Sequence, residues 1–177
     1  MTQDHSSERV HVALGSNLGD REGHLRRALQ DIANLPEVSE LVCSSLYETA
    51  PMGPQDQPDY LNAVCRFDHT GTVRGLMGRL QAIEQEHGRQ TGGRRWGERP
   101  LDLDILLSGA QLISEPDLVV PHPGLVDRSF VLWPLAELDE NLVVPGELGQ
   151  GRTIRQWQQQ CQRLGIQRLP GGPLITP

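Results

Sequence analysis

Residues 88–107 read GRQTGGRRWGERPLDLDILL, a glycine-rich loop that runs into a short alternating segment. Apolar and acidic residues alternate over residues 101–107, which is typical of a β-strand with one buried face. The alternation places Asp102 and Asp104 together on the opposite face, about 7 Å apart at their Cα atoms. The buried face is expected to carry Leu101, Leu103, Ile105 and Leu107.

The loop and the strand together indicate a site for phosphates. Carboxylate oxygens are the ligands that Mg²⁺ prefers, and Mg²⁺ commonly bridges protein carboxylates to substrate phosphates. Guanidinium groups donate paired hydrogen bonds to phosphate oxygens. The loop supplies four of them, Arg89, Arg94, Arg95 and Arg99. The two aspartates alone fit an exposed edge strand equally well, but the attached arginine loop favours a functional site.

Outward from this stretch, the apolar pattern predicts a strand, a helix, two strands, a second helix and then the 101–107 strand. The strands are expected at residues 10–14, 39–47 and 60–67, and the helices after the caps Asp20 and Thr72. This order is the split βαβ, or ferredoxin-like, pattern, an α+β fold in which two helices cover one face of an antiparallel sheet. The other face is expected to be open to ligands.

Two residues of the 60–67 strand share that open face with the aspartates. Tyr60 and Asn62 alternate with the apolar residues that the core requires, so they point away from the helices. An aromatic ring and an amide that point outward, as those of Tyr60 and Asn62 do, can also be ordinary surface side chains of a sheet. A stiff loop with prolines at positions 51, 54 and 58 leads into them, which favours a binding role.

The C-terminal third is less regular. Residues 126–133 suggest a short helix that Pro134 breaks, and Thr153 with Gln156 forms a capping-box pattern at the start of a last helix. The tail, residues 169–177, is expected to be loosely ordered. The chain is predicted to be one domain over residues 1–177, with a core at about 9–142 and a helix and tail at 143–177.

Composition excludes several classes of protein. The chain has 177 residues, a net charge of −7 and sixteen basic residues that are all arginine. The acidic balance argues against nucleic-acid binding, and the absence of lysine excludes a Walker-type phosphate loop. No apolar run is long enough for a membrane helix, and the polar N-terminus lacks a signal-peptide pattern. A cytoplasmic location is therefore expected, and a monomer is expected because no extra apolar surface demands a partner.

Three stretches resemble one family. GPQDQPDYLNAV (53–64), RWGERPLDLDILL (95–107) and VPHPGLVDRSFVLWPL (120–135) are similar to 6-hydroxymethyl-7,8-dihydropterin pyrophosphokinases, and the resemblance extends over residues 10–142. It implies the same ferredoxin-like fold. It also implies transfer of pyrophosphate from ATP to the pterin's hydroxymethyl oxygen, which gives AMP and the pterin diphosphate in folate biosynthesis.

The resemblance also implies roles for particular residues. Asp102 and Asp104 would hold two Mg²⁺ ions, and Arg89 and Arg99 would engage the phosphates during the reaction, with residues 88–97 as a closing lid. The pterin would lie among Thr49, Ala50, Met52, Tyr60, Asn62 and Phe130, with the two rings stacked on its faces. ATP would lie near Gln81, Glu84, Arg95, Trp96, Ile105, His122 and Arg128.

Four positions depart from the family pattern. Many members carry a proline at Ala50, a further arginine at Thr91 and a basic residue at Asp117, and some carry an aromatic residue at Pro123. These changes concern the ATP side of the site more than the pterin side. Two other functions stay open: a non-catalytic ferredoxin-like module that binds nucleotides or RNA, and a paralogue that binds ATP or pterin without turnover.

Overall fold

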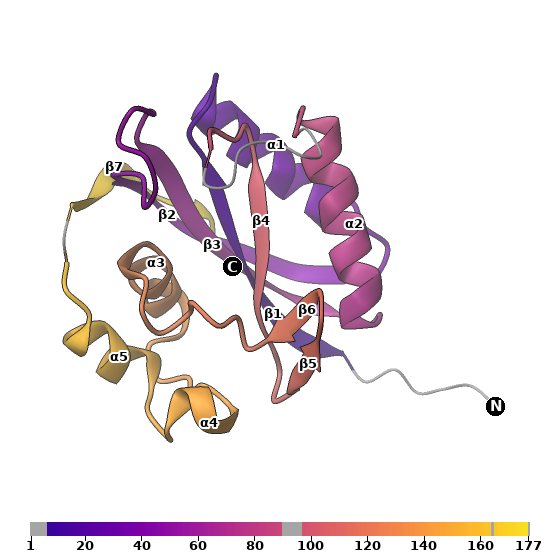
Figure 1. Cartoon of the computed structure of the whole chain (residues 1–177). Coiled ribbons are helices and arrows are strands. Elements are labelled where there is room, and N and C mark those ends of the chain that lie inside the picture. Colours follow the sequence, from indigo (N-terminus) through magenta and orange to yellow (C-terminus); the bar gives the residue numbers. More distant parts are fainter. Residues whose placement is uncertain (1–6, 90–96, 164, 177) are drawn as a thin grey trace.

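The chain folds around one twisted sheet that has helices on both sides (Figure 1). The computed structural model describes residues 7–89, 97–163 and 165–176. The strands are β1 (Glu8–Ser16), β2 (Val38–Thr49), β3 (Tyr60–His69), β4 (Asp102–Ser108), β5 (Ile113–Glu115), β6 (Leu118–Val120) and β7 (Ile166–Ile175). The helices are α1 (Arg21–Ala33), α2 (Val73–Glu86), α3 (Ser129–Asp139), α4 (Gly146–Gly149) and α5 (Ile154–Gln160).

The sheet confirms the ferredoxin-like prediction. Its strand order is β4-β1-β3-β2-β7, and every neighbouring pair is antiparallel. The predicted helix starts are also confirmed, because the Asp20 and Thr72 side chains accept hydrogen bonds from Gly23 N and Gly75 N. The capping box of Thr153 and Gln156 forms as predicted at the start of α5.

The sheet has a hydrophobic core on each face. Helices α1 and α2 pack on one face around residues such as Phe67 and Leu80. Helix α3 packs against β2 and β3 on the other face, in a second core that includes Val64 and Leu132. The prediction of a fully open second face was therefore wrong. The end of that face near Tyr60 and Asp102 still lines a pocket.

A bulge corrects the predicted alternation of β4. Val12 pairs with Ile105 but His11 pairs with Leu107, so the register shifts between them. One extra residue in β4 sends Leu107 into the second core, away from Leu103 and Ile105. The predicted common face of four residues therefore ends at Ile105, while Asp102 and Asp104 keep the predicted face.

Helix α3 continues through Pro134, contrary to the predicted break. The proline is the sixth residue of the helix, so it removes a single hydrogen bond to the carbonyl of Phe130. Val131, Leu132 and Leu135 are fully or nearly fully buried around it. Burial of these side chains in the second core offsets the missing bond.

The tail is a strand and was wrongly predicted to be loose. β7 pairs with the outer edge of β2, from Ile166 opposite Thr49 to Ile175 opposite Cys43. Arg168 fastens the contact by donating to Ser45 Oγ over 2.8 Å. Pro170 and Pro173 obscured this strand in the sequence, and an edge strand tolerates them because one side makes no ladder bonds.

Asp139, the last residue of α3, links this helix to the sheet. Its carboxylate accepts a bond of 2.6 Å from Arg66 and lies 2.7 Å from His11 Nε2. Burial acts to raise the pKa of Asp139, but the hydrogen bonds from His11 and Arg66 outweigh it and lower the pKa overall.

Replacing Asp139 with asparagine should lower the free energy of unfolding by about 2 kcal/mol, because Arg66 would lose its charged partner. Urea unfolding measures the change. Asp68→Asn is the matched control, since it breaks an exposed pair with Arg9 that should contribute less than about 1 kcal/mol. Equal losses in the two variants would contradict a special role for Asp139.

Candidate active site

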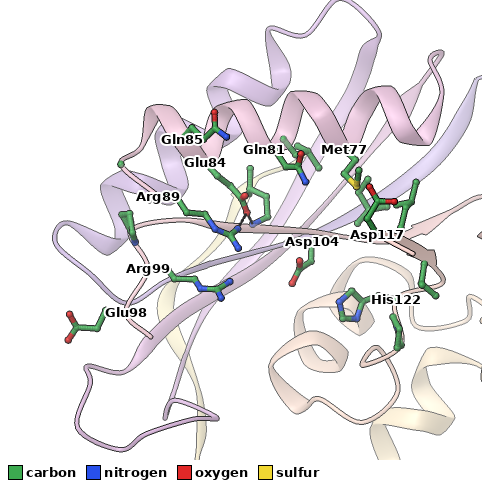
Figure 2. A pocket seen from close by; sticks show the side chains of 18 of the residues that line it. Met77, Gln81, Glu84, Gln85, Arg89, Glu98, Arg99, Asp104, Asp117 and His122 are labelled. Carbon is green, nitrogen blue, oxygen red and sulfur yellow. Dashed lines mark hydrogen bonds and ion pairs between the residues drawn. The ribbon is translucent and has the colours of Figure 1, made fainter. Parts of the chain in front are cut away.

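Two chambers that share several lining residues lie beside β4. The larger has a volume of about 1010 Å³ between α2, β4 and the segment 116–123, and the smaller has about 300 Å³ beside the 49–60 loop. Arg89, Arg99, Asp104 and His122 line both. Figure 2 shows the two arginines extending toward Asp104, with His122 across from them. The chambers therefore meet at the charged residues that the sequence singled out.

Asp102 is held by both predicted phosphate-binding arginines. Its Oδ1 accepts from Arg89 over 2.8 Å and from Arg99 over 3.1 Å. Arg89 also forms an ion pair with Glu84. In the free protein, the guanidinium groups of Arg89 and Arg99 are thus paired with carboxylates. A phosphate that binds these arginines would have to compete with the carboxylates for them.

Asp104 lies deeper and lacks such a partner among the described residues. Burial and the neighbouring Asp102 carboxylate raise its pKa above the usual value, against the opposing charges of Arg128, Arg89 and Arg99. Two carboxylates that repel each other from neighbouring positions on one strand face are stabilised by a bound cation. Asp102 and Asp104 thus fit Mg²⁺, which takes one or two carboxylates together with substrate phosphates.

The described residues contain no larger cluster of side chains that could bind a metal. No cluster of three or more histidine, cysteine, aspartate or glutamate side chains in the described ranges could coordinate an ion. The two-aspartate arrangement therefore suits a hard, oxygen-loving ion that the substrate helps to hold, and it is poorly suited to zinc, which prefers nitrogen and sulfur ligands.

Glu84 is the most buried acid of the site, with 5% of its surface exposed. Its carboxylate accepts the backbone N–H of Leu103 over 2.7 Å, which joins α2 to β4. Burial raises the pKa of Glu84 from 4.5 to about 7, although Leu103 and Arg89 act to lower it. Its protonation therefore changes near neutral pH.

Glu84→Gln should change how stability depends on pH. Between pH 4.5 and 7 the folded carboxyl keeps a proton that the unfolded chain has lost, so folding becomes less favourable as the pH rises. From pH 5 to pH 8 the wild type should lose about 2 to 3 kcal/mol relative to Glu84→Gln. Urea unfolding at both values tests this. The exposed neighbour Glu86→Gln should show no such difference, and parallel curves for Glu84→Gln would contradict it.

The smaller chamber gathers most of the residues predicted for the pterin. Thr49, Ala50, Met52, Tyr60 and Phe130 line it together. Asn62 does not line it. Its amide donates to Thr49 Oγ1 over 2.7 Å and is 6% exposed, so it lies just behind the wall. The predicted stacking of a ring between Tyr60 and Phe130 stays a prediction, to which this shared chamber gives a physical basis.

The larger chamber gathers part of the predicted ATP set. Gln81, Glu84, Ile105 and His122 line it, whereas Arg128 lines only the smaller chamber. Burial, followed by the charge of Arg128, lowers the pKa of His122. Arg95 and Trp96 lie outside the described residues, as do Arg94 and Thr91 of the predicted lid.

Asn17 is a residue that supports the site from behind, and the sequence reasoning missed it. In the sequence alone, residues 15–19 (GSNLG) indicate no more than a tight turn between a strand and a helix. In the structure the Asn17 side chain is fully buried, accepts from Arg99 N over 2.8 Å and donates to Gln57 Oε1 over 3.0 Å. Asn17 thereby links the end of β1 to Arg99 and to the proline-containing loop before β3. The polar residue directly after a buried strand was the available signal.

A pair of arginines, two neighbouring carboxylates and a chamber with two aromatic residues lie together on a ferredoxin-like sheet. Such a combination is typical of enzymes that act on a substrate carrying phosphates. A family model for 7,8-dihydro-6-hydroxymethylpterin-pyrophosphokinase matches residues 11–140. The chain belongs to this family.

Comparisons with individual proteins agree. A pyrophosphokinase of 2-amino-4-hydroxy-6-hydroxymethyldihydropteridine from Pseudomonas aeruginosa is 44% identical over 164 residues, which cover 93% of this chain and 98% of that protein. One from Haemophilus influenzae is 45% identical over 136 residues, covering 77% of this chain and 84% of that protein.

Solved structures match the fold. The wild-type HPPK-DHPS of Plasmodium falciparum superimposes with a TM-score of 0.69 at 13% identity, over 90% of this chain. The chain spans 44% of that longer protein. No helix in the described part of the chain is long and apolar enough to cross a membrane.

Proposed function

We propose that the protein transfers pyrophosphate from ATP to 6-hydroxymethyl-7,8-dihydropterin, with AMP as the second product. The hydroxymethyl oxygen bonds to the β-phosphorus, the bond from that phosphorus to the oxygen retained by AMP breaks, and the hydroxyl proton is released. The observation that carries the proposal is the meeting of the two chambers at Asp104, Arg89, Arg99 and His122. A phosphate chain in one chamber and an alcohol in the other would come together there.

The chain's own residues supply binding, orientation and charge. Arg89 and Arg99 would exchange their contacts with Asp102 for phosphate oxygens, which suits a reaction that depends mainly on positioning and electrostatics. Asp102 and Asp104 would hold two Mg²⁺ ions, which neutralise phosphate charge when bound. His122 would add a hydrogen bond at the junction of the chambers.

The smaller chamber would hold the pterin. Tyr60 and Phe130 offer aromatic faces, and the Tyr60 hydroxyl donates to Gly97 O over 3.4 Å, at the end of the arginine segment. Asn62 would act through Thr49, whose Oγ1 it holds at the chamber wall. The wall thus combines apolar faces with fixed polar atoms, as a flat hydrogen-bonding ring requires.

One assay tests the function. The protein is incubated with ATP, Mg²⁺ and the reduced hydroxymethylpterin, and AMP is measured. AMP that requires both the pterin and Mg²⁺ is the expected result. Binding of ATP or pterin by calorimetry without AMP would instead support the paralogue that binds without turnover.

Tyr60→Ala should weaken pterin binding about tenfold to a hundredfold while leaving ATP binding within about twofold, because one stacking face is lost. Isothermal titration with each ligand separately measures this. Tyr47→Ala is the control for loss of a sheet tyrosine, since the Tyr47 hydroxyl donates to Glu137 of α3 and Tyr47 lines neither chamber. An equal loss of both ligands in Tyr60→Ala would overturn the assignment of the smaller chamber.

We further propose that the enzyme works as a monomer in the cytoplasm, where ATP is available. The described residues of a single copy already form both chambers and bring the arginines, carboxylates and rings together, so the proposed chemistry needs no second copy. Light scattering coupled to size exclusion at the assay concentration should give the mass of one chain. A stable dimer would contradict this part of the proposal.

A further inference from the structure

A tight turn at residues 122–125 joins β6 to the loop before α3 and lies at the junction of the chambers. His122 N donates to Leu106 O over 2.9 Å, which fixes the turn to β4, and Leu125 N donates to His122 O over 3.0 Å. Inside the turn, Gly124 N donates to His122 Nδ1 over 3.0 Å. The neutral His122 ring therefore carries its proton on Nε2, the nitrogen outside this turn.

Gly124 is not required by the backbone of this turn. The described glycines with a positive φ do not include it, so a side chain there would meet no conformational strain. The space beside it is nevertheless taken. A Cβ at position 124 would lie 2.5 Å from Arg128 Nε and 2.7 Å from Arg128 Cζ, well inside van der Waals contact.

The group that uses this space is the guanidinium of Arg128, the residue before α3. It lies 5.8 Å from the centre of the Phe130 ring and lines the smaller chamber together with Asp104 and His122. A guanidinium over an aromatic face is attracted to the ring, and near Asp104 it opposes the repulsion between the two aspartates. Its position thus affects the aromatic wall and the carboxylates together.

We propose that Gly124 is a positioning residue: its missing side chain reserves the volume in which the Arg128 guanidinium lies beside Phe130 and Asp104. The inference rests on the proposed function for its kinetic test, but it concerns the placement of one cation and can also be measured by binding. Because the displaced atoms are the far end of a long side chain, a methyl group at position 124 should move Arg128 without disturbing the core.

The test is Gly124→Ala, made in the wild type and in an Arg128→Ala background. Alanine keeps the backbone N–H, so the bond to His122 Nδ1 is retained and only the volume changes. In the wild-type background, kcat/KM for the pterin should fall about tenfold or more, the usual effect of losing one charged contact. In the Arg128→Ala background the same change should alter it less than about twofold, because the group that it displaces is absent.

Gly78→Ala is the matched control. It adds the same methyl group in the middle of α2, where nothing lies within 4 Å of the new Cβ, so kcat/KM should stay at the wild-type value. The melting temperature of Gly124→Ala should also stay within a few degrees of the wild type. A loss in stability that persists with Arg128→Ala would assign Gly124 to packing of the turn and overturn the proposal.

Two further results would overturn it: full activity of Gly124→Ala, or the same kinetic loss in both backgrounds. If the wild type makes no AMP, the proposed function fails, and the double comparison is repeated with equilibrium binding of the pterin. Coupling between positions 124 and 128 in that binding supports the inference, and independent effects overturn it.

Discussion

Asp104→Ala should reduce the rate of AMP formation about a thousandfold or more, equivalent to about 4 kcal/mol in the barrier. Asp104 lines both chambers and stands where the phosphate chain and the alcohol would meet. Its pKa is raised by burial and by Asp102, so it gains more than an exposed acid from a bound cation. Replacing it with alanine removes one of the two protein side chains that are proposed to bind Mg²⁺. A single-turnover assay at saturating ATP and Mg²⁺ measures the effect on chemistry directly.

The same variant should fold at least as well as the wild type in the absence of ligands. Alanine relieves the repulsion between two carboxylates, so the melting temperature of the free protein should not fall. Asp68→Ala, at the far end of β3, is the control for loss of an aspartate and should keep the wild-type rate. Wild-type turnover by Asp104→Ala would sink the assignment of the metal ligands.

Arg89→Ala is expected to lower kcat about a hundredfold to a thousandfold and to change the KM for ATP by less than about threefold. In the free protein this guanidinium is committed to Asp102 and Glu84, so it can reach the phosphates only by leaving them. In the ground state, the binding energy between Arg89 and the phosphates is therefore partly offset by the loss of these ion pairs. Arg89 stabilises the transition state more strongly, because negative charge develops on the phosphates there.

Steady-state kinetics with both substrates varied separates the two parameters. Arg9→Ala provides the control, since Arg9 makes an exposed ion pair with Asp68 far from the chambers. A rise in KM with unchanged kcat would make Arg89 a simple ground-state contact. Arg89→Ala should in addition raise the pKa of Glu84, because the variant lacks one of the groups that lower it.

Local pattern predicted the parts of this protein that depend on a short stretch of chain. The alternation of β4 placed Asp102 and Asp104 on one face, and the caps Asp20 and Thr72 marked the helix starts. The strand order followed from the succession of elements, because few topologies accept it. Family resemblance then supplied the chemical roles, and the family itself is confirmed by the comparisons.

Other features of the fold depend on packing between residues that are far apart in the sequence. A local pattern of residues gives no information about such packing. The bulge that turns Leu107 to the second core depends on pairing with β1, almost a hundred residues earlier. Helix α3 runs through Pro134 because the sheet buries its apolar side, and β7 forms because the outer edge of β2 offers unpaired backbone groups. Each of these was predicted wrongly from propensity alone.

The sequence by itself thus determined which groups the protein can bring to its chemistry: two carboxylates, a set of arginines, two rings and a histidine. Only the tertiary structure decided which of these groups contact one another. It paired Arg89 and Arg99 with Asp102, put Arg128 in the smaller chamber beside Gly124, and joined Asn17 to Arg99 and Gln57. The physical reason is that charge pairing and volume depend on distance in space, whereas spacing along the chain sets only which face a side chain takes.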